Sequence, residues 1–434
     1  MDYHFCKYAA EKGDLKSLIF AFQNECYPTG GLNAPWKEIC TLASLNGHLD
    51  CLIYARDHGC PWDEWTCAYA SRNGHLNCLS YLHEHGCPWD DWTCIKAAEN
   101  GHLDCLKYAH EQGCPWDKFT CAYASNNGHL NCLKYAHEHG CTWDEKICSF
   151  AARYGSMDCL VYAHENGCPW NIWTCAYAAE KGHLDCLKYA HEKGCPWNDW
   201  TCAYAAQRGH LDCLKYAHEQ GCPWNVWIST NAAENGNLHC LIYAHEHGCC
   251  WNKSTCEKAA MKGHLNCLVY AHEQGCPWDE DTSENAARNG HLDCLKYAHE
   301  QGCPWNEKTC TNAAFAGHLD CLIYAHEQGC PWDEYICKNA ARHLDCLAYA
   351  IYNGACFNYV SVRIIEKALR RRHYLRLIIR KIRDLQKKRL KRALNRISEA
   401  WIVYSYAPVR GRPGYERALK SFYDQQGLTN TNRE

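Results

Sequence analysis

The chain has 434 residues, of which 47% are hydrophobic and 22% charged, a composition that excludes wholesale disorder. A single hydrophobic core rarely grows beyond about 250–300 residues, so we expect several domains or an array of repeats. The charge is divided along the chain, because residues before 361 carry a net −18 and residues from 361 onward a net +14.

The amino terminus and the cysteines bear on the compartment. The first residues, MDYHFCKYAAEKGD, contain no basic flank followed by an apolar stretch, so we expect no signal peptide. No apolar run approaches the roughly 18 residues of a membrane helix, which predicts that the chain does not span a membrane. We therefore expect an intracellular protein, cytoplasmic or nuclear, in which most of the 37 cysteines are reduced thiols.

Internal repetition dominates the sequence. A glycine opens the segment GHLDC, or a close variant of it, at intervals of 27 residues. These glycines are Gly47, Gly74, Gly101, Gly128, Gly155, Gly182, Gly209, Gly236, Gly263, Gly290 and Gly317. Degenerate copies at Gly13 and His343 bring the number of repeats to 13. A fixed period of this size predicts a solenoid, in which each repeat buries its apolar face only against its neighbours.

One repeat, residues 117–143, illustrates the local signals. Pro115 cannot donate a backbone hydrogen bond, so the CPW segment before the repeat is expected to be extended. Asp117 has the short acceptor side chain of a helix N-cap, and every complete repeat has Asp or Asn there. The Ala-rich run that follows predicts a first helix ending at Gly128, and residues 130–138 predict a second helix. We expect two short antiparallel helices in each repeat.

These residues resemble the ankyrin repeat. The segment TCAYAS at residues 120–125, followed by GHL at 128–130, is similar to that family's first helix and inter-helix turn. Residues that match its second helix and following turn are Cys132, Leu133, Tyr135, Glu138 and Gly140. The resemblance covers residues 1–358. It implies an all-α solenoid of stacked helix-turn-helix repeats whose first helices and turns line the binding face.

The sequence departs from the ankyrin pattern in two ways. The period is 27 residues against about 33, which predicts that the projecting hairpin is reduced to a tight turn. The tetrapeptide TPLH is also absent. Cys- and Trp-rich arrays of this kind resemble ankyrin-like proteins that giant DNA viruses of amoebae encode in large numbers, and a viral origin would place the protein in a host cell.

The leucine-rich repeat is the nearest competing fold. Leu130, Leu133 and Tyr135 roughly fit the spacing of its strand. That fold requires Asn or Cys after the strand, where this chain has Glu138, and it also requires β-branched strand residues. The ankyrin-like interpretation is therefore favoured.

Each repeat has three regular cysteine positions, represented by Cys105, Cys114 and Cys121. Zinc binding is one interpretation, because His102 and Cys105 are spaced i,i+3 at a helix start. Packing is favoured, since a free cysteine behaves as a small buried hydrophobe and serine replaces the Cys121 position in two repeats. We therefore predict no metal site and no cofactor.

A second histidine recurs near the end of the second helix, from His83 to His326, and a tryptophan recurs in the CPW turn. A residue type that is repeated ten times is poor ground for a single active site, so both series are predicted to be structural. We expect the tryptophans to staple neighbouring turns together. If the histidines are partly buried, their protonation near pH 6.5 predicts destabilisation by acid.

The repeats differ mainly on the first helix. Counting the N-cap residue as the first position, the third and seventh positions change from aromatic in the first half of the chain to polar in the second. Because core positions should repeat and surface positions can drift, we expect an exposed strip that binds a protein partner through aromatic anchors. This aromatic strip is Trp65, Tyr69, Trp92, Phe119, Tyr123, Phe150, Trp173, Tyr177, Trp200 and Tyr204. The alternative that these rings only pack between helices stays open.

The end of the chain leaves the repeat pattern. Residues 359–397 predict a basic amphipathic helix that caps the last repeat, and residues 398–434 form a C-terminal tail without an assigned function. The basic patch of this helix is Arg370, Arg371, Arg372, Lys387, Lys388, Arg389, Lys391 and Arg392. It could be solvated, lie against the acidic body, direct nuclear import, or bind nucleic acid or an anionic membrane.

No enzyme signature emerges, since GxSxG, HExxH and a phosphate loop ending in GK[ST] are all absent. We therefore predict a non-enzymatic, monomeric scaffold that binds a protein through the aromatic strip. The alternative is nucleic-acid binding through the basic helix. The negative charge of residues before 361 disfavours a nucleic acid along the repeats themselves, because it would repel phosphates.

Overall fold

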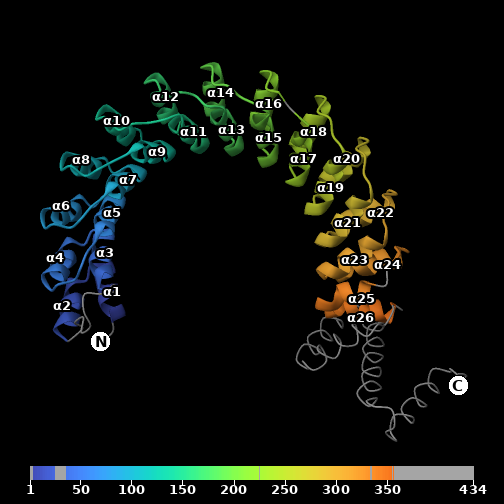
Figure 1. The fold of residues 1–434 in the computed structure, drawn as a ribbon, viewed down its shortest axis with the longest axis horizontal. Coiled ribbons are helices and arrows are strands. Elements are labelled where there is room, and N and C mark those ends of the chain that lie inside the picture. The colour runs from blue at the N-terminus through green and yellow to red at the C-terminus, as the bar shows by residue number, and fades with distance from the viewer. Residues whose placement is uncertain (1–2, 25–35, 224, 333–334, 354, 356–434) are drawn as a thin grey trace, which may run out of the picture. The chain divides into compact units, whose positions relative to one another are not determined.

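The structure is a computed structural model, and it describes residues 3–24, 36–223, 225–332, 335–353 and 355. Throughout these ranges the chain forms helices joined by short turns and contains no strand. The chain divides into two compact units, an N-terminal unit of Met1–Ile228 and a C-terminal unit of Ser229–Glu434. Figure 1 labels the helices. The absence of strands in the described ranges excludes the leucine-rich repeat there.

The helices alternate between the first and second members of each repeat. The N-terminal unit contains α1 (Tyr3–Lys12), α2 (Leu15–Gln23), α3 (Lys37–Leu45), α4 (Leu49–Asp57), α5 (Glu64–Arg72), α6 (Leu76–Glu84), α7 (Asp91–Glu99), α8 (Leu103–Glu111), α9 (Lys118–Asn126), α10 (Leu130–Glu138), α11 (Lys146–Tyr154), α12 (Met157–Glu165), α13 (Ile172–Lys181), α14 (Leu184–Glu192), α15 (Asp199–Arg208) and α16 (Leu211–Glu219). Helix α17 (Trp227–Glu234) begins at the end of this unit.

The C-terminal unit continues the same alternation. It contains α18 (Leu238–Glu246), α19 (Lys253–Lys262), α20 (Leu265–Glu273), α21 (Glu280–Asn289), α22 (Leu292–Glu300), α23 (Glu307–Ala316), α24 (Leu319–Glu327), α25 (Ile336–Asn339), the 3-10 turn η1 (Ala340–Arg342) and α26 (Leu344–Tyr352). The described residues thus hold 26 α-helices, or 13 pairs, which agrees with the 13 repeats of the sequence. None of the helices in the described part of the chain is long and apolar enough to cross a membrane.

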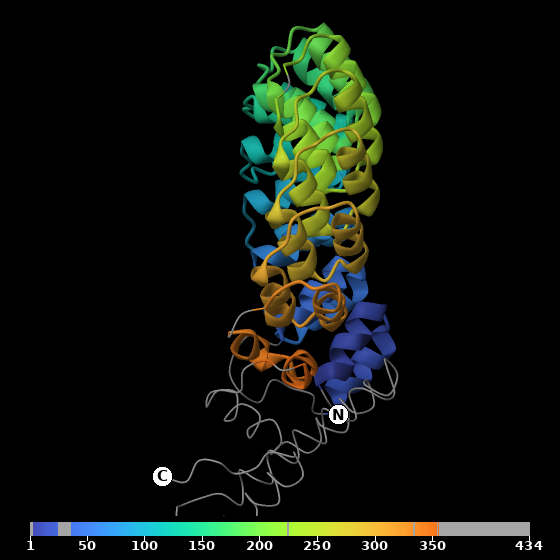
Figure 2. The same ribbon diagram turned by 90° about the vertical axis from the view of Figure 1, so that its right-hand side faces the viewer.

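Within each unit the odd-numbered first helices form one row and the even-numbered second helices form another (Figures 1 and 2). Neighbouring first helices contact each other more extensively than neighbouring second helices do. The row of first helices is therefore the more tightly packed, and the sequence difference between repeats falls on this row.

The helix boundaries follow from the capping signals of the sequence. The carboxylate of Asp117 accepts a hydrogen bond of 2.8 Å from the backbone N–H of Phe119 at the start of α9. Gly128, after α9, has φ 78°, and Gly140, after α10, has φ 84°. This left-handed conformation is one that glycine adopts without strain, which explains why glycine ends both helices of a repeat. The predicted bounds of the second helix, residues 130–138, are confirmed.

The core of the array consists of small and medium-sized side chains. On α10, Cys132, Leu133 and Ala136 are buried, whereas Leu130, which the apolar stripe placed beside them, is only half-buried. All described cysteines except Cys250 are buried, which confirms the prediction that they pack in the core.

The turn cysteines also form hydrogen bonds within each repeat, which the sequence interpretation missed. The Cys141 thiol donates to the Asp117 carbonyl at 3.0 Å, and the Cys114 thiol donates to the Asp90 carbonyl at 3.1 Å. Each bond joins the turn at the end of a repeat to the N-cap residue at its start. These thiols therefore satisfy backbone carbonyls as well as filling space.

An aromatic ladder joins the second helices. The His110 ring stacks on Trp116 with a centroid distance of 3.9 Å, and its Nδ1 lies 3.0 Å from the Tyr135 hydroxyl of the next repeat. Trp116 also makes an edge contact with Tyr135 at 6.2 Å. The structural role predicted for the histidines is confirmed. The tryptophan joins its turn to the second helix of the next repeat. Trp170 also reaches the next turn, because its Nε1 donates to the Lys193 carbonyl at 3.3 Å, which bears out the predicted staple between turns at that position.

Two of the predicted segments lie outside the described residues. These are the basic helix at 359–397, with its basic patch, and the tail at 398–434. The capping role of the first segment stays a prediction.

Candidate functional site

All ten residues of the aromatic strip belong to the N-terminal unit, on helices α5, α7, α9, α11, α13 and α15. Most of the helices carry two of them, four residues apart, so that both side chains lie on the same helix face. Trp173 and Tyr177 on α13 stack with centroids 5.7 Å apart, and Trp200 and Tyr204 on α15 are 5.4 Å apart. Each of these helices therefore presents a paired aromatic surface.

The strip is partly open to solvent. Trp65 is 38% exposed, Phe119 45% and Trp200 43%, which are large fractions for aromatic residues. The other seven residues of the strip are half-buried. Part of each ring therefore packs against the array, and part is left for contact with another molecule.

Ring contacts also connect successive repeats. Trp65 on α5 and Trp92 on α7 lie with their centroids 5.9 Å apart. The Lys96 ammonium lies 5.3 Å from the centroid of Trp92, a distance at which a cation is attracted to the ring. These contacts hold the aromatic side chains in place and lower the entropy that a partner would have to remove on binding.

A charged cluster adjoins the second half of the strip. The Glu180 carboxylate on α13 is only 8% exposed. Arg208 on α15 donates to it at 3.3 Å, Lys181 lies 3.6 Å from it, and the Arg153 guanidinium on α11 lies 3.9 Å from it. We call these four residues the Glu180 cluster. Its three cations and one carboxylate leave a net charge of +2.

The Glu180 cluster and the aromatic strip form one surface. The Arg153 guanidinium lies over the Tyr177 ring at 4.9 Å. Burial raises the pKa of the Tyr204 hydroxyl, and the neighbouring charge of Glu180 raises it further. The effect of the Glu180 charge places Tyr204 close to the cluster. The strip at α11–α15 therefore combines aromatic surface with an excess of positive charge.

Sequence reasoning missed the Glu180 cluster. The signal was available, because Arg153 and Glu180 occupy the same position in successive repeats and have opposite charges. Stacked helices bring such positions together, so a reversal of charge at a spacing of 27 residues indicates an ion pair between repeats.

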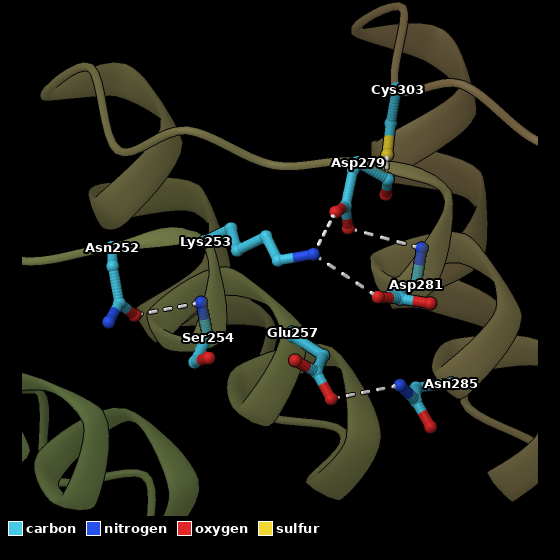
Figure 3. A network of polar contacts seen from close by, with 8 residues as sticks. All are labelled: Asn252, Lys253, Ser254, Glu257, Asp279, Asp281, Asn285 and Cys303. Carbon is cyan, nitrogen blue, oxygen red and sulfur yellow. Dashed lines mark hydrogen bonds and ion pairs between the residues drawn. The ribbon is translucent and has the colours of Figure 1, made fainter.

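The same face of the C-terminal unit is polar, as the sequence predicted. Lys253 forms ion pairs with Asp279 at 2.6 Å and with Asp281 at 3.5 Å (Figure 3). Asn285 donates to the Glu257 carboxylate at 3.3 Å, and burial raises the pKa of Glu257. These side chains replace the aromatic rings of the first half, so the two units offer different surfaces.

Possible metal ligands, among them the cysteine thiols, recur throughout the described residues. Within the described ranges no group of three or more His, Cys, Asp or Glu side chains is arranged to hold a metal ion. Burial raises the pKa of Cys105 to about 12, so this thiol stays protonated and unreactive at neutral pH. The Cys121 thiol hydrogen-bonds to Cys141 in the same repeat, and this bond together with burial raises the pKa of Cys121.

Comparison with known proteins identifies the repeat type. The family model "Ankyrin repeats (many copies)" matches residues 175–218, which correspond to most of α13–α16. Among solved structures, the crystal structure of the human ASB11 ankyrin repeat domain is 20% identical in sequence, with a TM-score of 0.32. That match covers 36% of this chain and 84% of that chain. A search of the curated proteins gives no match.

Proposed function

We propose that this chain, an array of ankyrin repeats, is a non-enzymatic scaffold that binds a protein partner through the aromatic strip of its N-terminal unit. Ankyrin repeats are in general protein–protein interaction modules. The observation that carries the proposal is the exposure of Trp65, Phe119 and Trp200 on three first helices, α5, α9 and α15, of the same unit. Large aromatic side chains in this setting are the usual anchors of protein interfaces.

The contrast between the first and second helices of a repeat supports the same assignment. The second helices and turns are nearly identical in most repeats, because they carry the aromatic ladder and the thiol hydrogen bonds. The first helices vary where their side chains face outward. Variation confined to one face fits a surface that is shaped for a partner, while the invariant face maintains the stacking.

A pull-down with matched variants tests this proposal. The full chain, a Trp173→Ala/Trp200→Ala variant and a Lys308→Ala/Asn312→Ala control would each be incubated with nuclease-treated extract of the cells that make the protein. The control changes two polar side chains, at the third and the seventh positions of the first helix α23, in the C-terminal unit. Circular dichroism melts would verify that all three proteins are folded.

The expected result is a protein captured by the full chain and by the control, with capture reduced at least tenfold by the aromatic double variant. The same proteins captured equally by all three would contradict the proposal.

The second candidate function is nucleic-acid binding by the basic helix, and it rests on the sequence of residues 359–397. The test would replace Lys387, Lys388, Arg389, Lys391 and Arg392 by glutamine in the full chain. Counterion release predicts an affinity for nucleic acid that falls steeply with salt and is lost in this variant. An affinity that the variant retains would argue against this candidate.

A further inference from the structure

We infer that the part of the aromatic strip on α11, α13 and α15 binds an extended, proline-containing peptide that carries acidic side chains. This inference rests on the proposed function and specifies the chemistry of the partner. It follows from two properties of the same surface, its positive charge and the interval between the aromatic rings of successive first helices.

The charge is set by the Glu180 cluster. One nearly buried carboxylate faces three cations, so the single negative charge of Glu180 leaves two positive charges unbalanced. The side chains of Arg153, Lys181 and Arg208 are 33%, 40% and 52% exposed, so an incoming group can reach them. A partner carboxylate would form charge-assisted hydrogen bonds there, which are about twice as strong as neutral ones.

The spacing favours an extended chain. Packed helices lie about 8–10 Å apart, so successive first helices present their paired rings at that interval. A polyproline II helix has three residues per turn and rises 3.1 Å per residue, so it repeats about every 9 Å. One turn of such a peptide therefore matches one ankyrin repeat, with a proline over Trp173 and another over Trp200. Proline-rich segments commonly dock on aromatic surfaces, because they are already extended before binding.

The other polyanion to consider is a nucleic acid, whose bases could stack on the same rings. Residues 1–228 contain 17 Lys and Arg against 27 Asp and Glu, a net charge of −10. A nucleic-acid strand carries a phosphate at every nucleotide, so this negative charge would repel it along its whole length. A peptide with a few carboxylates needs only the local positive charge, so the peptide is favoured.

Fluorescence anisotropy with the full chain would test the inference. Four labelled probes of equal length would be used: a polyproline peptide with interspersed glutamates, its glutamine version, its lysine version, and a single-stranded oligothymidine. The protein variants would be Arg208→Glu, Trp200→Ala and the control Arg288→Gln. Arg288 occupies the position of Arg153 five repeats later, on α21 in the polar C-terminal unit.

We expect the glutamate peptide to bind about tenfold more tightly than the glutamine peptide, and the lysine peptide to bind most weakly. Arg208→Glu brings the net charge of the cluster from +2 to zero, so it should abolish the preference for glutamate and tighten binding of the lysine peptide relative to the unchanged protein. Trp200→Ala should weaken binding of every peptide. Arg288→Gln should change nothing. Because Arg208→Glu predicts a gain with the lysine peptide, loss of folding cannot imitate the expected result.

Equal affinity for the three peptides, or tighter binding of oligothymidine at the strip, would overturn the inference. If no peptide binds while Trp173→Ala/Trp200→Ala still releases a captured protein, the inference fails and the proposed function stands. If that double variant releases nothing, both fail.

Discussion

The contact between each inter-helix glycine and the next repeat can be tested by adding a single methyl group. A Cβ atom at Gly101 would lie 2.5 Å from Nδ1 and 2.8 Å from Cε1 of His129. A Cβ atom at Gly113 would meet nothing within 4 Å. Both glycines have φ near 80°, so alanine is strained equally at the two positions. The pair separates backbone strain from the clash with histidine.

The expected losses of stability follow from the backbone strain and from the clash with histidine. Placing alanine in the left-handed region costs about 1–2 kcal/mol, which is the whole effect expected for Gly113→Ala. Gly101→Ala must also displace the His129 ring from its hydrogen bond to the Glu99 carbonyl. Overpacking of this kind costs about 1–3 kcal/mol more. We therefore expect a loss of about 2–5 kcal/mol for Gly101→Ala.

Gly128 provides a further comparison, because Ser156 stands where most other repeats have the histidine. A Cβ atom there would lie 3.2 Å from the Ser156 hydroxyl oxygen, a contact that a rotation of the serine can relieve. Gly128→Ala should therefore resemble Gly113→Ala.

Urea unfolding followed by circular dichroism would give the order of the midpoints, and hydrogen exchange would locate the weakened repeats. His129→Ala combined with Gly101→Ala should lose less stability than the sum of the two single changes. Equal losses for Gly101→Ala and Gly113→Ala, or strict additivity in the double variant, would refute this account of the glycines.

Three further predictions concern the histidines of the inter-helix turns, the aromatic ladder and the helix N-caps. Burial lowers the pKa of His129 and His183 below that of the unfolded chain. The stability that these neutral histidines contribute is therefore full above about pH 6.5 and is lost as the pH falls below it. The urea midpoint should drop between pH 7.5 and 5.5, and a constant midpoint would contradict this. Tyr135→Phe should cost about 1 kcal/mol in thermal unfolding because it removes the hydroxyl bound to His110, whereas Tyr189→Phe should cost nothing or stabilise, since the buried Tyr189 hydroxyl has no partner among the described residues. Asp117→Ala should cost about 1 kcal/mol by removing the N-cap bond, to be checked by the same unfolding assay.

The sequence was sufficient to predict the helix pairs, because each boundary has a local cause. Asp117 caps one helix, and Gly128 and Gly140 end the two helices of a repeat by adopting positive φ. The burial of the cysteines was predictable for the same reason, since the period of 27 places each of them at a fixed point of the repeat. These features depend only on residues that are close in the chain.

The features that were missed depend on contacts between residues far apart in the sequence. The bond from the Cys141 thiol to the Asp117 carbonyl spans 24 residues, and the pairing of Arg208 with Glu180 spans 28. Their geometry depends on the angle and distance between stacked helices, which a repeating pattern alone does not specify. The contact of Trp116 with Tyr135 was missed for the same reason.

The two faces of a repeat also separate stability from binding. The aromatic ladder, the thiol bonds and the glycine–histidine contacts all involve residues that recur in nearly every repeat. The ladder and the glycine–histidine contacts hold each repeat to the next, and the thiol bonds close the repeat itself. The open parts of the strip residues contribute little to these contacts. Surface substitutions away from such contacts usually change stability by less than about 0.5 kcal/mol. Exposed residues such as Phe119 and Trp200 can therefore vary between repeats without loss of the stack, which is the property that a binding surface requires.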